Sequence, residues 1–176
     1  MVSLERRSAI TVQIPVHLRT ATAKDLPLLE WFGQYRHFRN LFRRTYREQQ
    51  AGRRLMLLAV ANHYPVGYIF IQFREDFSRR TDRAYFYSFR VMDMFQRQGI
   101  GTLLLQEAEA RAAERGVQRA TIAVAKENTD ARRLYERLDY VVYDEDDGDW
   151  SYVDHRGRIC YVSEPCWLLE KYLSIG

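Results

Sequence analysis

The chain has 176 residues, of which 47% are hydrophobic and 14% aromatic. These values are typical of one globular domain with its own core, and they exclude an intrinsically disordered chain. The net charge of +4 is too small to indicate a nucleic-acid partner by itself. No stretch approaches the roughly 20 apolar residues that cross a bilayer. We therefore expect a single domain over residues 1–176, located in the cytoplasm and without a membrane partner.

The residues that most often bind metals are too scattered to form a site. Cys160 and Cys166 match neither a C-x-x-C redox pair nor a zinc motif, and the four histidines have no ligand spacing. No metal site is predicted.

The first third of the chain predicts a short strand followed by two helices. Residues 16–19 form the strand, and apolar positions from Leu26 to Phe32 indicate a helix over residues 22–32. A second helix is expected over residues 35–50, ending at Gly52. Its arginines recur at helical spacing and form a basic stripe, made of Arg36, Arg39, Arg43 and Arg47.

An antiparallel set of strands is predicted next. Residues 54–60 and 66–73 are rich in β-formers and are separated by Asn and Pro, which indicates a hairpin. Residues 84–91 add a third strand after a charged loop at 75–82. A helix to residue 115 and a strand at 120–124 follow, so this crossover makes the strands at 84–91 and 120–124 parallel neighbours.

The C-terminal third predicts one more helix and further strands. Asn128 can cap a helix whose apolar face contains Ala131, Leu134, Tyr135 and Leu138. A strand begins at residue 140, a hairpin surrounds a turn at 154–157, and a short strand follows at 165–169. The predicted fold class is α/β: a mixed, mostly antiparallel sheet with one parallel pair and helices on both faces.

A glycine-containing turn at residues 96–101 has the features of an anion site. It reads Gln-Arg-Gln-Gly-Ile-Gly, directly after a strand and before a strongly helical run. Backbone N–H groups at such a helix N-terminus bind anions, and glycine lets the backbone approach closely. A dinucleotide fold would need a third glycine, and a P-loop would need Gly-Lys-Ser/Thr; both are absent.

Together these features resemble the GCN5-related N-acetyltransferase (GNAT) superfamily over most of the chain. The turn at 96–101 matches its [RQ]-x-x-G-x-[GA] pyrophosphate loop. The sequence Asn128-x-x-Ala131-x-x-Leu134-Tyr135-Glu136 matches its second cofactor element. The glycine loop alone would be a weak signal, but the loop, this element and the strand order form a specific combination.

The resemblance implies acetyl transfer from acetyl-CoA to a primary amine of a small molecule, protein N-terminus or lysine, with CoA as product. It implies that Tyr135 protonates the departing thiolate, a role suited to a phenol. The loop would hold the pyrophosphate, the splayed strand would pair with the pantetheine arm and polarise the thioester carbonyl, and Asn128 would contact the pantetheine. The cofactor-binding residues expected by this resemblance are Phe89, Arg90, Val91, Gln96, Arg97, Gln98, Gly99, Ile100, Gly101, Thr102, Asn128 and Tyr135.

The general base of many family members has no counterpart here. The strand before the Asn128 helix reads Ile-Ala-Val at 122–124, and the strand at 84–91 has no acid. The base could be a water held by Tyr87 or Ser88, or Asp93 from another loop, and no base is needed if the amine arrives neutral.

Asp139 stands where the family usually has the glycine that ends the last helix. We expect a non-glycine residue in a left-handed conformation there, at a cost of about 1 kcal/mol.

The acceptor side is less specific. The resemblance places the amine between the first two helices and the C-terminal hairpin, so the basic stripe and residues 150–152 would form the rim. An acidic cluster, Asp144 to Asp147 with Asp149, could attract a cationic amine or be a solvated loop. Three further hypotheses stay open: a CoA-binding regulatory domain without turnover, a nucleic-acid module using the arginines, which is disfavoured, and a homodimer.

Overall fold

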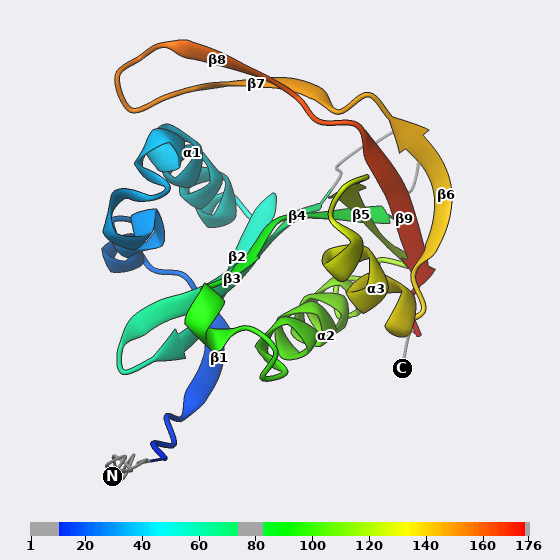
Figure 1. The fold of residues 1–176 in the computed structure, drawn as a ribbon, viewed down its shortest axis with the longest axis horizontal. Helices are drawn as coiled ribbons and strands as arrows, with labels where there is room; N and C mark the ends of the chain where they lie inside the picture. Colours follow the sequence, from blue (N-terminus) through cyan, green and yellow to red (C-terminus); the bar gives the residue numbers. More distant parts are fainter. Residues whose placement is uncertain (1–10, 74–82, 175–176) are drawn as a thin grey trace, which may run out of the picture.

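The computed structural model of the protein describes residues 11–73 and 83–174, and within them the main sheet has seven strands. Their order is β1-β2-β3-β4-β5-β9-β6, and a separate hairpin, β7–β8, arches over one side of the molecule (Figure 1). The strands are β1 (Val16–Thr20), β2 (Arg54–Ala61), β3 (Tyr64–Phe73), β4 (Arg83–Val91), β5 (Arg119–Ala125), β6 (Val141–Asp146), β7 (Asp149–Val153), β8 (Ile159–Ser163) and β9 (Cys166–Tyr172).

Helices cover both faces of the sheet, as predicted. Helix α1 (Arg39–Gln50) packs on one face, and α2 (Ile100–Ala113) and α3 (Thr129–Arg137) pack on the other (Figure 1). Alternate residues of the central strands therefore enter two different cores: Leu57 and Ile69 face α2, whereas Leu58 and Phe70 face α1. Short 3₁₀ turns complete the fold: η1 (Ala23–Asp25), η2 (Leu28–Gly33), η3 (Arg36–Phe38) and η4 (Asp93–Phe95).

The strand pairing confirms the predicted hairpin and crossover. β2 and β3 pair antiparallel, and the turn between them is Asn62-His63, both with positive φ, as a tight hairpin turn requires. β4 and β5 are parallel neighbours, the one parallel pair among the described strands. The sequence did not indicate that β9 would lie between β5 and β6.

Two predicted helices before β2 were wrong in extent. Residues 22–32 form the turns η1 and η2 instead of one helix, because Pro27 lacks an N–H donor and Trp31 and Phe32 have left-handed φ values of 41° and 57°. The Trp31 indole donates a buried 2.9 Å hydrogen bond to the Pro65 carbonyl, which holds this kink against β3. The helix expected from residue 35 begins as an α-helix only at Arg39, after η3.

Near the C-terminus, the acidic cluster is not a loop. Asp144 and Asp146 belong to β6 and Asp149 begins β7, while the last strand is longer than predicted. The Asn128 cap is confirmed, since its Oδ1 accepts from the Ala131 N–H at 3.1 Å. Asp139 has a φ of 67°, the left-handed conformation expected there. The predicted charged loop at 75–82 lies outside the described residues.

Gly67 on β3 lets α2 pack tightly against the sheet. A Cβ at this position would lie 3.1 Å from Leu104 Cδ1 and 3.2 Å from the Arg90 carbonyl oxygen. We expect Gly67→Ala to lower the free energy of unfolding by about 1–3 kcal/mol, because backbone must move to make room. Urea denaturation measures this change.

Gly101→Ala is the matched control for that substitution. Its Cβ would meet its nearest atom, Phe89 Cζ, at 3.4 Å, and alanine favours the helix that it joins. A loss of stability in Gly101→Ala as large as that in Gly67→Ala would contradict the role given to Gly67.

Candidate active site

The site forms where β4 separates from β5. The two strands pair from Arg83↔Arg119 to Phe86↔Ile122, and β4 then continues to Val91 along β3 alone. Ser88 has a left-handed φ of 50°, and the β3–β4 register shifts around it, which marks a β-bulge. A bulge bends its strand and increases its twist. Among the described strands, residues 87–91 consequently have a partner on one side only.

The glycine turn lies at the end of this separated segment and forms a candidate anion cradle. Gly99 is the N-cap of α2 with a φ of 86°, and a Cβ there would meet nothing within 4 Å. The first-turn N–H groups of Ile100, Gly101 and Thr102 have no partner inside the helix. Unpaired N–H groups at a helix N-terminus can bind an anion, and the pyrophosphate-binding role of this loop stays a prediction.

Side chains of the turn divide into two roles. Gln96 donates to the Val91 carbonyl at 2.9 Å, and Gln98 donates to the Met94 carbonyl at 3.1 Å, so both hold the turn in shape. Arg97 is exposed, with a left-handed φ of 62°, and has no ion-pair partner among the described residues. Its charge is therefore available to a bound anion.

Close packing connects the cradle to α3. Gly101 lies within 3.4–3.5 Å, measured from an added Cβ, of Phe89 on β4 and Leu134 on α3. The Phe89 ring in turn stacks on Tyr135, with 6.2 Å between the centroids. The separated strand, the cradle and the second motif, which are distant in sequence, thus meet at one place.

Tyr135 lies at this meeting point and is only 4% exposed. Burial raises the pKa of its phenol, and the neighbouring Tyr85 adds to the rise. The phenol therefore stays protonated throughout the neutral range, which is the form that a general acid requires, although a raised pKa also makes it a weaker acid. This agrees with the general-acid role, which stays a prediction, as does the contact of Asn128 with pantetheine.

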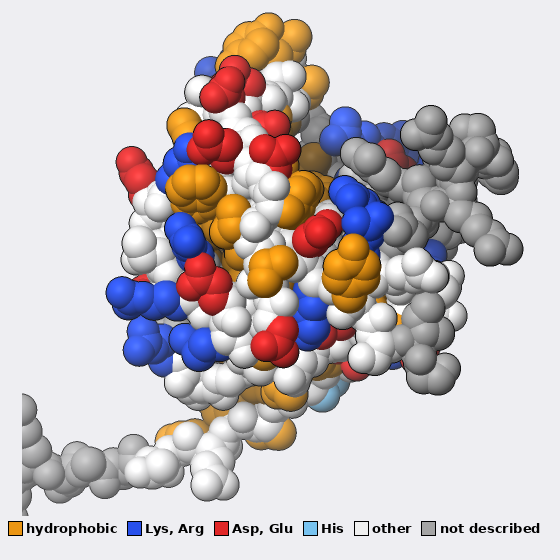
Figure 2. Space-filling model, turned by 90° about the vertical axis from the view of Figure 1, so that its right-hand side faces the viewer, with side chains coloured by type: hydrophobic (Ala, Val, Ile, Leu, Met, Phe, Trp, Pro, Cys, Tyr) orange, Lys and Arg blue, Asp and Glu red, His pale blue; other side chains and the backbone are white. Residues whose placement is uncertain are grey.

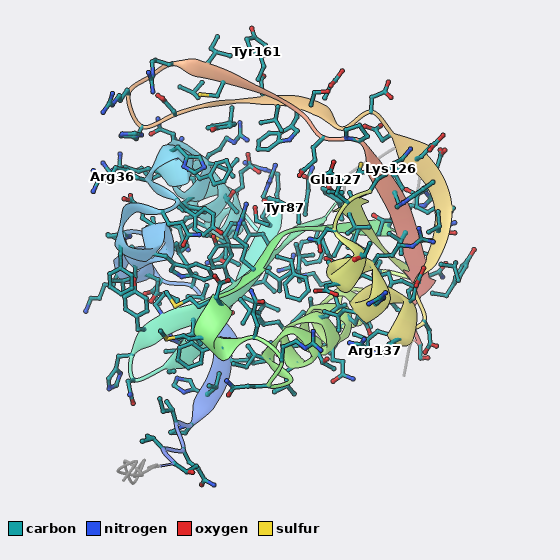
Figure 3. All side chains as sticks on the ribbon, viewed as in Figure 1. Arg36, Tyr87, Lys126, Glu127, Arg137 and Tyr161 are labelled. Atoms are coloured by element: carbon teal, nitrogen blue, oxygen red, sulfur yellow. The ribbon has the colours of Figure 1, made fainter. Side chains whose placement is uncertain are left out.

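The residues considered for the general base lie on β4 and directly beyond it, and their part in proton removal stays a prediction. The Tyr87 hydroxyl accepts a hydrogen bond from Arg54 and lies 3.4 Å from Thr45 Oγ1. Figure 3 shows Tyr87 between α1 and α3. Asp93 is exposed and accepts from Gln96 at 3.1 Å. Ala123 on β5 is half-buried and has no ionisable group.

The β7–β8 hairpin closes over α1 through Asp154. The Asp154 carboxylate accepts the backbone N–H groups of Arg156 and Arg158 at 2.8 and 2.9 Å, and the Arg158 backbone bond lowers its pKa to about 2. Asn40 of α1 donates to the Asp154 carbonyl at 2.7 Å. These bonds position Tyr152, whose ring lies 4.9 Å from Phe38.

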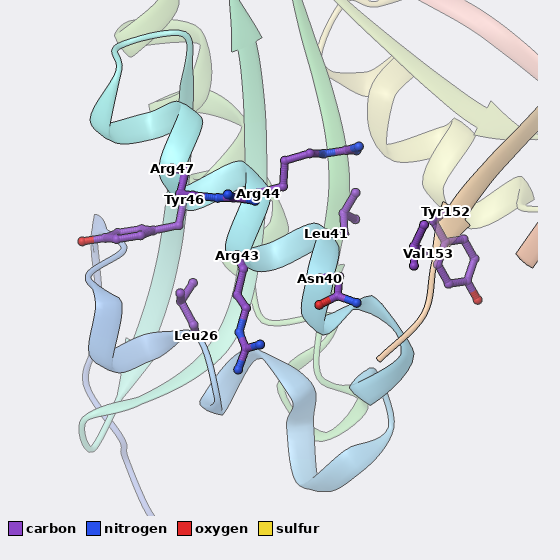
Figure 4. A pocket seen from close by; sticks show the side chains of 9 residues that line it. All are labelled: Leu26, Asn40, Leu41, Arg43, Arg44, Tyr46, Arg47, Tyr152 and Val153. Carbon is purple, nitrogen blue, oxygen red and sulfur yellow. The ribbon is translucent and has the colours of Figure 1, made fainter. Parts of the chain in front are cut away.

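A pocket of about 710 Å³ lies between α1 and the end of β7 (Figure 4). The arginines of the predicted basic stripe have two different surroundings. Arg36 and Arg39 lie against Glu30, and the distance from Arg39 Nη2 to Glu30 Oε2 is 2.8 Å. Arg43 and Arg47 line the pocket. The pocket is lined by Leu26, Asn40, Leu41, Arg43, Arg44, Tyr46, Arg47, Tyr152 and Val153.

The acidic residues of β6 are exposed, and Glu145 forms an ion pair with Lys126. On this side of the molecule acidic side chains lie among basic and hydrophobic ones (Figure 2). Such mixing does not create a strong field of one sign.

Among the described residues there is no cluster of His, Cys, Asp and Glu side chains that could hold a metal, and no helix is able to cross a membrane.

Two side chains on the α1 face were not predicted from the sequence to take part in the site. Arg90 was expected to act through its backbone, but its guanidinium lies over the Tyr35 ring at 4.7 Å. His37 is half-buried beside Phe38, at 4.1 Å between ring centroids. Burial, and then the charge of Arg90, lower the His37 pKa, so this imidazole is neutral at pH 7.

The family model for the acetyltransferase (GNAT) family matches residues 22–140, more than half of the chain. The chain therefore belongs to the GNAT family, which makes it an N-acetyltransferase. No curated protein matches the sequence.

Solved structures share the fold at low sequence identity. The ribosomal-protein-S18-alanine N-acetyltransferase of Escherichia coli is 21% identical, with a TM-score of 0.68 over 92% of this chain and 96% of that one. NAA60 of Arabidopsis thaliana in complex with acetyl-CoA is 18% identical, with a TM-score of 0.68 over 90% and 98%. The PaiA N-acetyltransferase of Thermoplasma acidophilum in complex with coenzyme A is 19% identical, with a TM-score of 0.68 over 90% and 99%. At these identities the likeness shows the fold alone.

Gly99→Ala tests the cradle. The left-handed φ disfavours alanine by about 1–2 kcal/mol, and the new methyl group would project into the open space of the cradle. We expect weaker CoA binding, measured by calorimetry. Gly116→Ala is the control, since it has a φ of 78°, no atom within 4 Å of its Cβ, and a place at the far end of α2. Equal losses of CoA affinity in the two variants would contradict the cradle.

Proposed function

We propose that the protein transfers the acetyl group of acetyl-CoA to a primary amine at the point where β4 leaves β5. The observation that carries this proposal is the separation after Phe86↔Ile122, directly beside the N-terminus of α2 and the Tyr135 phenol. The separated backbone of residues 87–91 supplies hydrogen-bonding groups for the pantetheine arm and the thioester carbonyl. The α2 N-terminus and Arg97 neutralise the diphosphate.

In the chemical step, the amine nitrogen attacks the thioester carbonyl carbon, a C–N bond forms and the C–S bond breaks. Tyr135 donates its hydroxyl proton to the departing thiolate, the amine loses one proton after attack, and Tyr135 regains a proton from solvent before the next turnover. No described carboxylate is poised to take that proton, so we propose that the amine arrives in its neutral form and releases the proton to solvent. Cytoplasmic location, the homodimer and the wider amine class of proteins or small molecules remain proposals from the sequence.

CoA should raise the melting temperature of the protein, because a ligand that binds only the folded state stabilises it by mass action. Thermal unfolding with and without millimolar CoA measures this shift. An unchanged melting temperature would contradict the proposal. A clear shift without acetyl-CoA consumption across a broad amine panel would instead support a regulatory CoA-binding domain.

Tyr135→Phe should lower kcat by about 100-fold or more while CoA affinity changes little, because it removes only the proton donor. With Tyr135 present, kcat should not decline from about pH 7 to 9, since burial keeps the phenol protonated above its usual pKa near 10. Steady-state kinetics across this pH range provide the measurement.

Tyr140→Phe is the matched control for Tyr135→Phe. Tyr140 is also buried, its ring is 6.1 Å from that of Tyr135, and its hydroxyl lies beside the Glu109 carboxylate, which adds to the effect of burial in raising its pKa. Its loss should leave kcat unchanged. A similar fall in kcat for both variants would argue against a specific proton transfer from Tyr135.

A further inference from the structure

Arg90 is a cation enclosed by aromatic rings on the α1 face of the separated strand. Its guanidinium carbon lies 4.7 Å from the centroid of Tyr35, 5.2 Å from that of Phe38 and 5.8 Å from that of Tyr68. The Nη1 atom is buried and forms no well-aligned hydrogen bond within residues 11–73 and 83–174; the Tyr68 hydroxyl lies near it, and the charge of Arg90 opposes the rise that burial causes in the pKa of that phenol. The rings attract the charge through their faces, but they leave this N–H donor unsatisfied.

The buried carboxylates of the described chain on this side are already occupied by other arginines. Asp25 binds Arg19 through two 2.7 Å hydrogen bonds, and Glu30 binds Arg39. Asp154 binds Arg158 at 2.8 Å. Arg90 therefore has no anionic partner among them. A partly buried guanidinium without one is costly, and a carboxylate in bidentate contact is the partner that its planar fork fits best.

The Arg90 side chain lies on the side of the separated strand from which the acceptor would enter. It follows Phe89, which packs on Tyr135 on the α2–α3 face, whereas the Arg90 side chain projects to the opposite face. An anion held by Arg90 would thus lie beside the separated strand, across it from the phenol. This side is where the acceptor enters if the proposed function holds.

The surroundings of Arg90 are apolar and reach solvent. Phe38 contacts Tyr152 at 4.9 Å, and Tyr152 contacts Trp150 at 5.3 Å between ring centroids. Trp150 is 42% exposed, and Tyr35 and His37 are half-buried, so one side of the cluster is accessible to solvent. Neutral His37 adds no second positive charge beside Arg90.

We propose that the acceptor is an α-amino acid with a large apolar side chain, whose carboxylate pairs with Arg90 and whose side chain packs against Phe38, Tyr152 and Trp150. This proposal rests on the proposed function. It disfavours polyamines, because a second cation beside Arg90 would be repelled without compensation.

Pairing with Arg90 also helps the amine to react. A free carboxylate beside an ammonium group favours the charged form, which cannot attack a thioester. Arg90 would neutralise that carboxylate and so lower the pKa of the amine toward the value of about 8 found for peptide α-amino groups. The acceptor could then enter neutral, as the lack of a poised carboxylate base requires.

The test compares acetylation of phenylalanine, phenylalaninamide and spermidine by the wild-type enzyme, Arg90→Met and Arg90→Lys. For the wild type, kcat/KM for phenylalanine should exceed that for phenylalaninamide by about 10-fold or more, the worth of a charged hydrogen-bonded pair. Arg90→Met should remove this preference by raising KM for phenylalanine, while kcat/KM for phenylalaninamide stays the same. Arg90→Lys should restore part of it. Arg43→Met, a change of a pocket arginine outside the aromatic cluster, should keep the preference.

Three results would overturn the proposal. The wild type could have equal kcat/KM for phenylalanine and phenylalaninamide, Arg90→Met could keep the preference for phenylalanine, or spermidine could have the highest kcat/KM of the three acceptors. The CoA-induced rise in melting temperature is measured on every variant. If it persists while none of the three compounds is acetylated, the acceptor assignment is wrong although the cofactor site stands. If CoA produces no shift in the wild type, the proposed function itself fails. If Arg90→Met does not fold, Arg90→Lys must still show the reduced preference.

Discussion

The separation of β4 from β5 after Phe86↔Ile122 is the constraint on which the rest of the site depends. A paired sheet edge would satisfy its own backbone and offer nothing to a ligand. Here the bulge at Ser88 turns β4 away while β3 continues to hold it, so residues 87–91 keep hydrogen-bonding groups available on the β5 side. Gly67 keeps α2 close to this strand, because a side chain there would press on Leu104 of α2 and on the Arg90 carbonyl oxygen. The cradle and the separated strand consequently form one surface.

Electrostatics on the two faces of that strand differ in a way that matters for chemistry. On the α2–α3 face, burial keeps Tyr135 protonated, as its proposed role as proton donor requires. On the α1 face, Arg90 is a cation enclosed by rings, and His37 is neutral. Neither face presents a carboxylate that is poised as a base among the described residues. Proton removal is therefore assigned to the ionisation state of the incoming amine, which the charge of Arg90 influences.

Local signals in the sequence were sufficient for the elements that carry the cofactor motifs. Gly99 and the helix that follows it, the Asn128 cap, the hairpin turn at Asn62-His63 and the left-handed Asp139 all depend on residues close in sequence. The secondary structure was predicted wrongly where it depends on packing between residues that are distant in sequence. Apolar spacing indicated a helix over residues 22–32, but Pro27 and the bond from Trp31 to the Pro65 carbonyl produced two short turns. The acidic residues expected in a loop entered β6 because β9 pairs with them.

The sequence by itself determined the family, the order of the elements and the glycine turn before α2, since each depends on residues close together in the chain. It also predicted that this turn binds the pyrophosphate and that Tyr135 donates a proton. Only the tertiary structure decided where β4 leaves β5, which carboxylates the arginines occupy, and that Arg90 remains without one. Those outcomes depend on burial and on contacts between segments such as Arg90 with Tyr35 and Tyr68, which no local pattern records. The physical reason is that desolvation and charge pairing are set by what surrounds a side chain in space, not by its neighbours along the chain.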